Sequence, residues 1–531
     1  MRVSDDAVTP RSPAGATAFT PAGETRHRHG RGARPAGGFG RALLLTLAGT
    51  AVPGTAYLAA GRRRLGAAVL VVFLLLAAGG VWLATSGRRE AVRLAVDSSA
   101  LMWIIGGVVA LAVAWLAVVV TGYRALRPHR LRRWQHLVGA LVVALLGAAV
   151  VAPAVVAVQV ATAQRDLVDS LFDDGDSATV TQPTDTSNAF GGKRSINVLL
   201  LGGDGGAGRE GVRTDTVIVA HVDTTTGATT LFSLPRNLED LPFPADSPLA
   251  AVYPDGFDAG SESESLLNAV YRNGPAAYPD ILGPTDDPGA DFLKLGVGAA
   301  LGLDIDYYLL VNLDGFSRLV DALGGITVNV NYYVPVGGEP SVGTLPDAYI
   351  APGPDQQMDG DTALDYARGR FNLTDYQRMD RQRCVLQAIV DSADPVTLLS
   401  RYQELARTTQ DIVSTDVPSA VLGDVVDLAF DVKDADLRSV VFDNTVIDPA
   451  YPDYDRIRAL VQEALAPAPA TTSASTPTPT PAPTTPAAPL SAVPAPAGNG
   501  GAASDVTDAC AYDPAQAAAA LAAGQPPTRA G

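Results

Sequence analysis

The stretch SINVLLLGGD at residues 195–204 decides the fold of the C-terminal part of the chain. It is a short apolar run that ends in glycines, which is the pattern of a buried strand. Two similar runs follow, TDTVIVAHVD at 214–223 and TTLFSLPRN at 229–237, and a Thr/Gly turn at 223–228 separates them. These three runs indicate that a sheet begins at Ser195.

Helix-like and strand-like patterns alternate after these strands, which favours a sheet covered by helices. We expect further strands at 306–313, 324–331 and 437–443, and helices at about 263–273, 291–302, 315–323, 376–393, 396–408 and 417–430. The Gly/Pro/Asp-rich runs 276–290 and 335–360 are expected to form surface loops. The sequence therefore predicts an α/β fold over residues 195–465, a three-layer α/β/α domain with a mixed central sheet.

The two parts of the chain carry opposite net charges. Residues 1–165 hold 19 arginines against five acidic residues, a net charge of +14, whereas residues 166–531 have a net charge of −31. The whole chain of 531 residues is 47% hydrophobic and 18% charged, which excludes wholesale disorder. Such a charge difference indicates that the two parts lie on opposite sides of a barrier.

Three apolar segments are long enough to span a bilayer, which takes about 20 residues. They cover about 65–86, 100–121 and 137–158, and none contains a charged residue. Buried helices of a soluble protein would be shorter and would have polar faces. Five arginines in the loop 123–136 predict that this loop is cytoplasmic. The chain beyond residue 160 then lies outside, so we expect a multi-pass protein of the cell membrane with an extracytoplasmic domain.

Residues 42–60 are also apolar, but a fourth crossing would place the basic N-terminus outside. Pro53 and Gly54 interrupt this segment in its middle. We therefore interpret it as a re-entrant or interfacial hairpin, with a true crossing as the alternative. The expected organisation is a cytoplasmic basic disordered tail at 1–40, a membrane region at 41–159, a stalk at 160–194, the α/β domain at 195–465, a Pro/Thr/Ala-rich linker at 466–503 and a short tail at 504–531.

Basic residues of the acidic part concentrate in RGRFNLTDYQRMDRQR, which begins at Arg368. Arg368 and Arg370 are two residues apart and share one face of an extended segment. In a helix that starts near Asp375, the side chains of Asp375, Arg378 and Gln382 stack on the apolar stripe that faces the core. Charged groups need partners there. The pattern indicates the floor of a polar pocket, with a purely structural ion-pair network as the alternative.

A second set of polar residues, Asp204, Arg213, Asp215 and Arg236, lies at the ends of the first three predicted strands. Strand ends are where α/β sheets present groups to a ligand. Two carboxylates suit a hard divalent cation, Mg²⁺ or Mn²⁺, and arginines suit phosphate, which a guanidinium binds through two hydrogen bonds. The structural alternative makes Asp204 a turn residue and Asp215 a hydrogen-bonding residue at the start of a strand.

Several catalytic motifs are absent from the acidic part. GGDGGAG at 202–208 is neither a P-loop nor GxGxxG, and no GxSxG motif occurs. His221 is the only histidine there, which argues against a histidine-based triad or a multi-histidine zinc site. Phosphoryl chemistry based on arginine, aspartate and a divalent cation remains.

With these residues the sequence resembles the LytR-CpsA-Psr family of cell-wall ligases. The resemblance runs from about Ser195 to Leu465 and rests on seven segments, LLLGGD, RTDT, FSLPRN, NAVYRNG at 268–274, DGFSRLVDALGGITVNV at 314–330, LDYARGR at 364–370 and DYQRMDRQ at 375–382. It implies a membrane-anchored, magnesium-dependent phosphotransferase. Such an enzyme moves a glycopolymer from a polyprenyl-pyrophosphate carrier to peptidoglycan and forms a phosphodiester link.

The resemblance also implies roles for individual residues. Asp204 and Asp215 resemble the metal ligands. The residues that resemble the catalytic, pyrophosphate-binding set are Arg236, Arg368, Arg370, Asp375 and Arg378, and those that resemble its substrate-binding neighbours are Arg213, Arg381 and Gln382. The implied partners are the polyprenyl-pyrophosphate-linked glycopolymer, peptidoglycan and the lipid bilayer. Nucleic acid is not among them, because an acidic extracytoplasmic domain has no route to DNA.

The sequence departs from the family pattern at two places. Gly205 and Gly206 stand where family members usually carry an arginine, for which Arg209 is a possible substitute, and Asn237 stands where an aspartate is usual. These departures leave two other functions open. The chain could be a non-catalytic wall-binding or sensor protein of the same fold, or a polyprenyl-pyrophosphate pyrophosphatase.

The two cysteines, Cys384 and Cys510, exclude a four-cysteine zinc site. Both lie in the part expected outside the cell, which is an oxidising setting. A bridge between them would tether the tail to the domain and contribute on the order of 4–5 kcal/mol in the chain-entropy description. A free, buried Cys384 is the alternative.

Overall fold

A computed structural model of the chain describes residues 38–172, 175–180, 190–205, 212–393, 413–466 and 504–529. The chain divides into two compact units. The first comprises residues 1–73 and 115–149, and the second comprises residues 74–114 and 150–531.

The N-terminal region is helical. Its helices are α1 (Phe39–Ala51), α2 (Thr55–Ala59), α3 (Arg63–Thr85), α4 (Arg88–Val96), α5 (Ser98–Leu126) and α6 (Arg133–Leu171). In the described residues α3, α5 and α6 are long and apolar enough to cross a membrane, as the sequence predicted. Helix α6 contains Pro153 and continues to Leu171, so the first part of the expected stalk is helical.

Within the first unit, α1 and α2 form a helical hairpin around Gly54, which has a positive φ of 101°. Helix α1 has 13 residues and so is about 20 Å long, less than the roughly 30 Å of a bilayer core. Two hydrogen bonds join the hairpin to α5. Trp115 Nε1 donates to Thr50 O at 3.1 Å, and the Tyr57 hydroxyl lies 2.5 Å from that of Thr121. Residues 42–60 thus form two short helices that are hydrogen-bonded to α5.

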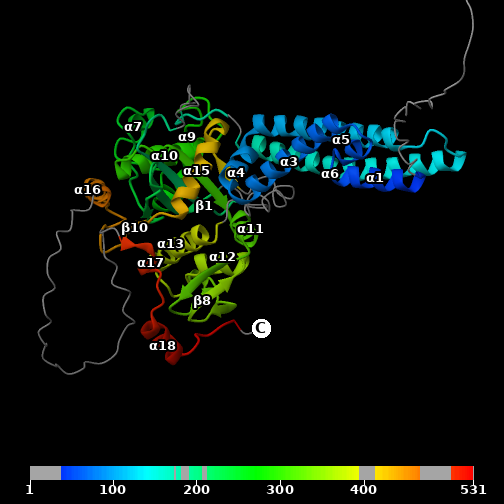
Figure 1. Ribbon diagram of the computed structural model, residues 1–531. Coiled ribbons are helices and arrows are strands. Elements are labelled where there is room, and N and C mark those ends of the chain that lie inside the picture. Colours follow the sequence, from blue (N-terminus) through cyan, green and yellow to red (C-terminus); the bar gives the residue numbers. More distant parts are fainter. Residues whose placement is uncertain are drawn as a thin grey trace, which may run out of the picture. The chain divides into compact units, whose positions relative to one another are not determined.

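The second unit contains the predicted α/β domain (Figure 1). Its strands are β1 (Ser195–Gly203), β2 (Thr214–Asp223), β3 (Thr229–Leu234), β4 (Tyr307–Asn312), β5 (Ile326–Val330), β6 (Val334–Val336), β7 (Ala348–Ile350), β8 (Gly353–Met358), β9 (Val413–Thr415), β10 (Leu437–Val441) and β11 (Ser504–Asp505). Its helices after α6 are α7 (Pro248–Val252), α8 (Glu262–Ser265), α9 (Leu267–Ala277), α10 (Pro288–Leu301), α11 (Leu313–Leu323), α12 (Gly360–Arg368), α13 (Asp375–Ser392), α15 (Leu422–Lys433), α16 (Tyr454–Leu465), α17 (Val506–Ala509) and α18 (Pro514–Ala523), with short 3₁₀ turns at 340–342 and 419–421.

The central sheet is mixed, as expected. Its strand order is β11-β10-β3-β2-β1-β4-β9. Strand β1 pairs antiparallel with β2 and parallel with β4, and β3 pairs antiparallel with β2 and parallel with β10. The β1–β2 pairing shifts register between Gly202 and Gly203, at the end from which Asp204 emerges.

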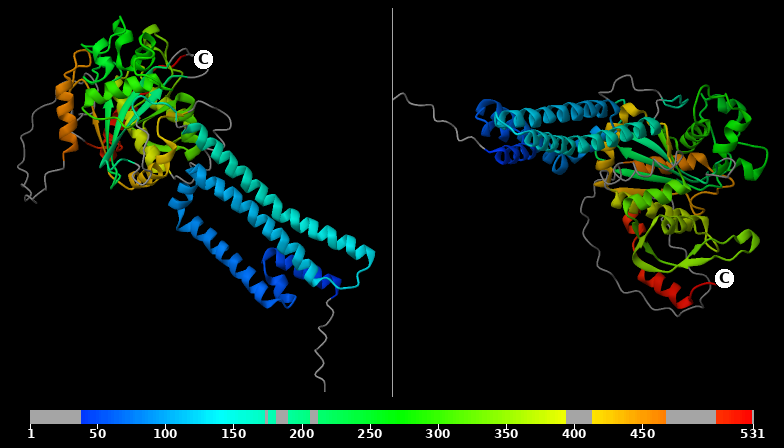
Figure 2. Two further views of the ribbon diagram at one scale, coloured as in Figure 1. Left: turned by 90° about the horizontal axis from the view of Figure 1, so that it is seen from above. Right: turned by 90° about the vertical axis from the view of Figure 1, so that its right-hand side faces the viewer.

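Helices cover both faces of this sheet and make the three layers (Figure 2). Successive strand side chains point to opposite faces, so Leu199 and Leu201 of β1 enter one core and Ile196 enters the other. The first core includes residues of α7, α9, α10 and α16, and the second includes residues of α15 and α17. The predicted three-layer α/β/α fold is therefore confirmed.

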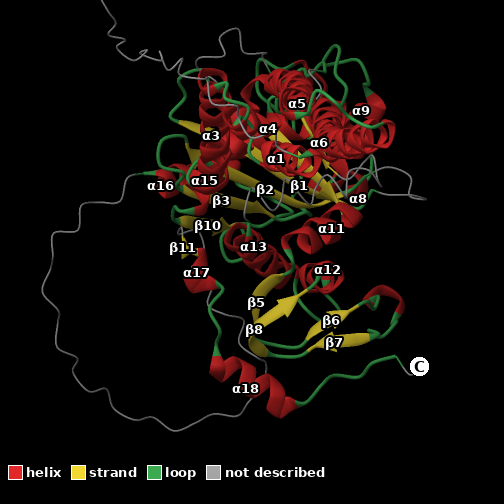
Figure 3. Ribbon diagram, turned by 45° about the vertical axis from the view of Figure 1, so that its right-hand side comes forward, coloured by secondary structure: helices red, strands yellow, loops and turns green. Residues whose placement is uncertain are grey.

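A third core, smaller than the first, lies beside the sheet. Helices α11, α12 and α13 pack there against β5 and β8, and β6 pairs with β7 (Figure 3). The run 335–360 was expected to be a surface loop, but it contains most of β6 and all of β7 and β8. Its strands are short, so the sequence offers too few residues for the period of two to emerge. The expected helix at 396–408 lies outside the described residues.

The C-terminal tail also belongs to the fold of the second unit. Strand β11 pairs antiparallel with β10, and a disulfide joins Cys384 on α13 to Cys510 after α17. The bridge that the sequence left open is thus present. It closes a loop of 126 residues that includes the Pro/Thr/Ala-rich linker.

Helix α4, in the same unit, packs against α15. Arg89 pairs with Asp431 at 2.8 Å, and Arg93 lies between Asp424 and Asp427 at 3.6 and 3.2 Å. Since α4 joins α3 to α5, the connection between these two apolar helices contacts the α/β domain.

Candidate functional site

One part of the site lies at the end of the sheet where β1 ends and β2 begins. Asp204 and Arg213 face each other there. The Asp204 backbone N–H donates to Arg213 O at 3.1 Å, and the Arg213 N–H donates to Asp204 Oδ1 at 2.8 Å. Asp215 follows two residues after Arg213. The antiparallel pairing of β1 with β2 therefore brings the two predicted metal ligands to one edge, as the sequence indicated.

Asp215 is the centre of a network of hydrogen bonds. Its Oδ1 accepts from Arg236 Nη1 at 2.8 Å and from Asn268 Nδ2 at 3.2 Å. Burial alone would raise the pKa of the Asp215 carboxyl, but these donors outweigh burial and hold the pKa below its ordinary value. Asp215 is therefore a carboxylate at neutral pH.

Helix α13 contributes Asp375 and Arg378 to the network. Thr374 caps it in a capping box with Gln377, which fixes the position of Asp375 in the first turn. Arg378 donates to Asp375 Oδ2 at 3.1 Å and to Asp215 O at 3.2 Å, so it joins α13 to β2.

Arg236 closes the network from the end of β3. Its Nε lies 3.5 Å from Asp375 Oδ1. Burial would lower the pKa of Arg236, but the carboxylates of Asp215 and Asp375 raise it above its ordinary value. Burial lowers the pKa of Arg378, whose side chain is only 4% exposed, and the charges of Arg236 and Arg370 lower it further.

The remaining predicted arginines lie at different depths. Arg368 ends α12 with its side chain exposed, and Arg370 follows in the loop to α13, half-buried. Arg381 is buried, and its guanidinium donates to the carbonyl oxygens of Tyr366 and Gly369 and to the Tyr332 hydroxyl. Arg381 thus holds the backbone between Arg368 and Arg370. Gln382 lies half-buried, one helical turn after Arg378.

Two buried polar atoms at this site have no hydrogen-bond partner among the described residues. They are Arg378 Nε and Asn268 Oδ1. Buried polar groups are ordinarily paired, so these two atoms are available to a ligand. The donor on Arg378 suits an anion, and the amide oxygen of Asn268, beside the Asp215 carboxylate, suits a hard cation.

The residues present fit a magnesium ion. Asp204, Asp215 and Asn268 offer the oxygen atoms that Mg²⁺ prefers, and Mg²⁺ commonly takes only one or two protein carboxylates beside phosphate oxygens. Among the described residues no group of three or more His, Cys, Asp or Glu side chains could hold a metal. A site with two carboxylates that is completed by substrate phosphate is consistent with this.

Sequence reasoning missed Asn268 and Glu264. Glu264 Oε1 accepts from Arg213 Nη2 at 2.6 Å, and its Oε2 accepts from Arg272 and from Asn273 Nδ2. Asn268, Arg272 and Asn273 all belong to NAVYRNG at 268–274, so the family-like segment was the available signal. An uncharged amide on a helix gave no other reason to expect contact with Asp215.

The chain is similar to proteins of known family. A profile of the LytR_cpsA_psr family matches residues 168–446. The polyisoprenyl-teichoic acid–peptidoglycan teichoic acid transferase TagU of Enterococcus faecalis is 30% identical over 250 residues, which cover 46% of this chain and 67% of that protein. The probable cell wall biosynthesis protein LcpB of Corynebacterium glutamicum is 31% identical over 210 residues, which cover 39% of this chain and 40% of that protein.

The chain thus spans between 40% and 67% of the length of these two relatives. The crystal structure of B. subtilis TagV has 23% sequence identity and a TM-score of 0.34, and the match covers 51% of this chain and 97% of that chain. Because the family profile matches more than half of the sequence, the chain belongs to the LytR_cpsA_psr family.

Proposed function

We propose that this protein is a membrane-anchored, magnesium-dependent phosphotransferase. It transfers a glycopolymer from a polyprenyl-pyrophosphate carrier to peptidoglycan and forms a phosphodiester link. The observation that carries the proposal is the network in which Arg236 and Arg378 meet Asp215 and Asp375 beside an unpartnered buried guanidinium N–H. Relatives named as transferases of polyisoprenyl-linked teichoic acid to peptidoglycan support it.

The arginines would bind the pyrophosphate. A part of the chain with a net charge of −31 repels such an anion unless positive groups gather at one place. Arg236 and Arg378 are held in position by carboxylates, and Arg370 adds a third guanidinium close by. Groups fixed in this way also stabilise the charge that develops on the transferred phosphoryl oxygens.

Asp204, Asp215 and Asn268 would hold the magnesium ion. When bound, the metal would neutralise charge on the pyrophosphate oxygens. The remaining work falls to the chain's own residues. Asp215 also orients Arg236, and Arg381 holds the Arg368–Arg370 backbone against the domain.

The α/β domain is placed outside the cytoplasm in this proposal. Helix α4 contacts α15, so the α3–α5 connection lies on the domain's side, and in the chain one apolar span, α5, separates this connection from the five arginines of the loop 123–136. This agrees with arginine-rich loops facing the cytoplasm. Protease added outside intact cells should therefore remove the domain and leave an antibody site in the 123–136 loop protected. Protection of the domain instead would reverse the orientation.

The direct test uses the full chain in detergent with a polyprenyl-pyrophosphate glycan and peptidoglycan oligomers. We expect a coupled product by mass spectrometry with Mg²⁺ and none with EDTA. Arg370→Ala should lower the rate by about 10²–10³-fold, the usual loss when one stabilising donor is removed. Arg438→Ala, at an exposed position of β10, is the matched control and should keep the wild-type rate.

Two outcomes would contradict the proposal. Release of phosphate without coupling to the acceptor would indicate the pyrophosphatase. Binding of the carrier without turnover would indicate a binding protein and would draw attention to Asn237, which stands in place of the usual aspartate.

A further inference from the structure

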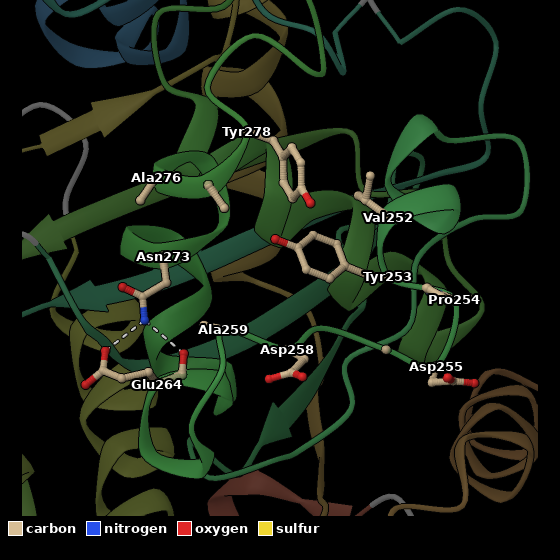
Figure 4. A pocket seen from close by; sticks show the side chains of 12 residues that line it. Val252, Tyr253, Pro254, Asp255, Asp258, Ala259, Glu264, Asn273, Ala276 and Tyr278 are labelled. Atoms are coloured by element: carbon tan, nitrogen blue, oxygen red, sulfur yellow. Dashed lines mark hydrogen bonds between the residues drawn. The ribbon is translucent and has the colours of Figure 1, made fainter.

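A cavity of about 650 Å³ lies beside the network just described, between the end of α7 and the C-terminal half of α9 (Figure 4). This volume is within the range of small-molecule sites, about 300–1,000 Å³. Its lining includes two tyrosines, three carboxylates and an amide, namely Tyr253, Tyr278, Asp255, Asp258, Glu264 and Asn273. The lining contains none of the residues proposed to bind pyrophosphate or magnesium.

One side of the cavity is aromatic. The rings of Tyr253 and Tyr278 meet edge to face, with their centroids 5.9 Å apart. Tyr278 is 41% exposed, whereas Tyr253 is 7% exposed and is held from behind by Phe243 and Phe257. A rigid inner ring and an accessible outer ring form a surface on which a flat, partly apolar ligand can pack.

The Tyr253 hydroxyl points into this space, toward Tyr278 (Figure 4). Among the described residues no hydrogen bond to that hydroxyl is formed, although the residue is more than nine-tenths buried. The hydroxyl oxygen lies at the surface of the cavity, where a ligand can reach it. The cavity therefore presents an unused donor and acceptor to whatever occupies it.

The other side of the cavity accepts hydrogen bonds. Glu264 is fixed by Arg213 and Asn273, and Asp258 is fixed through Oδ1 by the Gly260 N–H at 2.7 Å and by the Ser265 hydroxyl at 3.1 Å. The lining contains no lysine, arginine or histidine. Arg213 and Arg272 pair with Glu264 from outside the lining, so the negative charge at the cavity comes mainly from Asp255 and Asp258, which disfavour anions and accept hydrogen bonds from hydroxyl groups.

Glu264 connects the cavity to the catalytic edge of the sheet. Its Oε1 forms an ion pair with Arg213 Nη2 at 2.6 Å, and the Arg213 backbone N–H donates a hydrogen bond to Asp204 Oδ1 at 2.8 Å. A ligand in the cavity thus lies one ion pair away from a proposed metal ligand. We propose that this cavity is a subsite for a neutral sugar ring, which packs on Tyr278 and donates its hydroxyls to Asp258 and Glu264.

The subsite rests on the proposed function, because a glycopolymer transferase handles sugars on both of its substrates. The sugar could belong to the acceptor strand or to the donor polymer, and the shared chemistry is an uncharged, hydroxyl-rich ring. A phosphate-bearing repeat would meet the carboxylates and be repelled. Two probes separate the sources: an oligomer of N-acetylglucosamine represents the acceptor, and an oligomer of neutral hexose without acetamido groups represents the donor.

Binding of each probe to the full chain in detergent is measured by calorimetry. We expect at least one probe to bind, with affinity lowered about tenfold in Tyr278→Ala and in Asp258→Asn, and lowered less in Tyr253→Phe, which keeps the ring. The control is Tyr451→Ala, an 84% exposed tyrosine outside the cavity, which should bind like the wild type. Absence of binding by either probe, equal binding by all variants, or preference for an anionic glycan would overturn the subsite.

Kinetics separate this proposal from the proposed function. If the wild type transfers glycan, Tyr278→Ala should raise the KM for the sugar-bearing substrate about tenfold and leave kcat nearly unchanged, because Tyr278 does not touch the reacting groups. Unchanged KM with normal transfer would overturn the subsite and leave the function intact. Sugar binding that is lost in Tyr278→Ala without any transfer by the wild type would support the subsite and refute the transferase.

Discussion

At the scale of single residues, Asp215 is the position at which the side chains of the candidate site meet. One carboxylate oxygen accepts from both Arg236 and Asn268, and the backbone oxygen of the same residue accepts from Arg378. Side chains from the segment after β3, from α9 and from α13 therefore converge on one position of β2. A carboxylate with several donors is favoured over its protonated form, in spite of the burial that opposes it.

Ionisation of the Asp215 carboxyl makes the stability of the fold depend on pH in the acid range. The pKa of Asp215 is lower in the folded chain than its ordinary value of 3.8, so the folded state binds this proton more weakly than the unfolded state. The stabilisation is complete above about pH 3.8 and is lost as the pH falls through the folded value. In Asp215→Asn we expect lower stability than the wild type at pH 7, and a difference that shrinks toward pH 3.

Denaturant midpoints measured at intervals from pH 7 to pH 3 check this. The exposed Asp246→Asn serves as the control and should follow the wild type at every pH. A difference between Asp215→Asn and the wild type that stays constant down to pH 3 would show that ionisation of Asp215 does not contribute.

The site residues that could be predicted from the sequence are those that stand out by the placement of their charge. Arg236, Asp375 and Arg378 stood out because charged groups at a strand end or on an apolar helical stripe need partners, and the structure joins them to Asp215. The same pattern could not show that Arg381, unlike Arg378, donates to carbonyl oxygens of α12 and of the loop after it. That difference depends on how α12 packs against α13, which no local pattern contains.

At the scale of elements, one buried ion pair joins α10 to the edge of the sheet. Lys294 on α10 pairs with Asp416, which follows β9, and also donates to Asp306 O at 3.0 Å. Asp416 in turn accepts from the Tyr308 N–H of β4 at 2.7 Å. Both charged side chains are nearly inaccessible, at 1% and 7% exposure. Burial raises the pKa of Asp416, which Lys294 only partly offsets.

Removal of the lysine alone should therefore be costly. Lys294→Met leaves a buried carboxylate without its cation, which typically destabilises by about 3–5 kcal/mol. Lys294→Met/Asp416→Asn should recover most of this loss, because the amide oxygen can still accept from the Tyr308 N–H. Urea unfolding of the three proteins measures these differences. Asp455→Asn, which removes a 93% exposed partner of Arg458, should cost less than about 1 kcal/mol.

The elements that the sequence predicted well are those with long or fully apolar patterns. The three spans and strands β1 to β3 fall within a few residues of their expected places. The run 335–360 is rich in Gly, Pro and Asp and so predicts a loop, yet β6 and β7 form a hairpin of three-residue strands there. Their pairing and the burial of Val334 in the third core, beside α11, α12 and α13, are tertiary effects.

At the scale of the whole second unit, the C-terminal tail is a structural part of the domain. Val506 is fully buried in the core that also contains Leu428 and Ile218. Asn329 donates to Cys510 O at 3.0 Å, and β11 extends the sheet beside β10. The sequence placed both cysteines on the same side of the membrane, but their approach depends on how the chain returns after the linker.

The disulfide should therefore stabilise the domain that carries α13. A bridge that closes a loop of this length contributes about 2–5 kcal/mol, mainly by restricting the unfolded chain. Cys510→Ser, Cys384→Ser and the double variant should each lose this amount, and the two single losses should not add, because either substitution removes the same bond. Reductant should lower the stability of the wild type to that of the variants and leave the double variant unchanged. Equal stability of the wild type with and without reductant, once loss of the bond is verified by mass spectrometry, would mean that β11 and Val506 hold the tail without the covalent link.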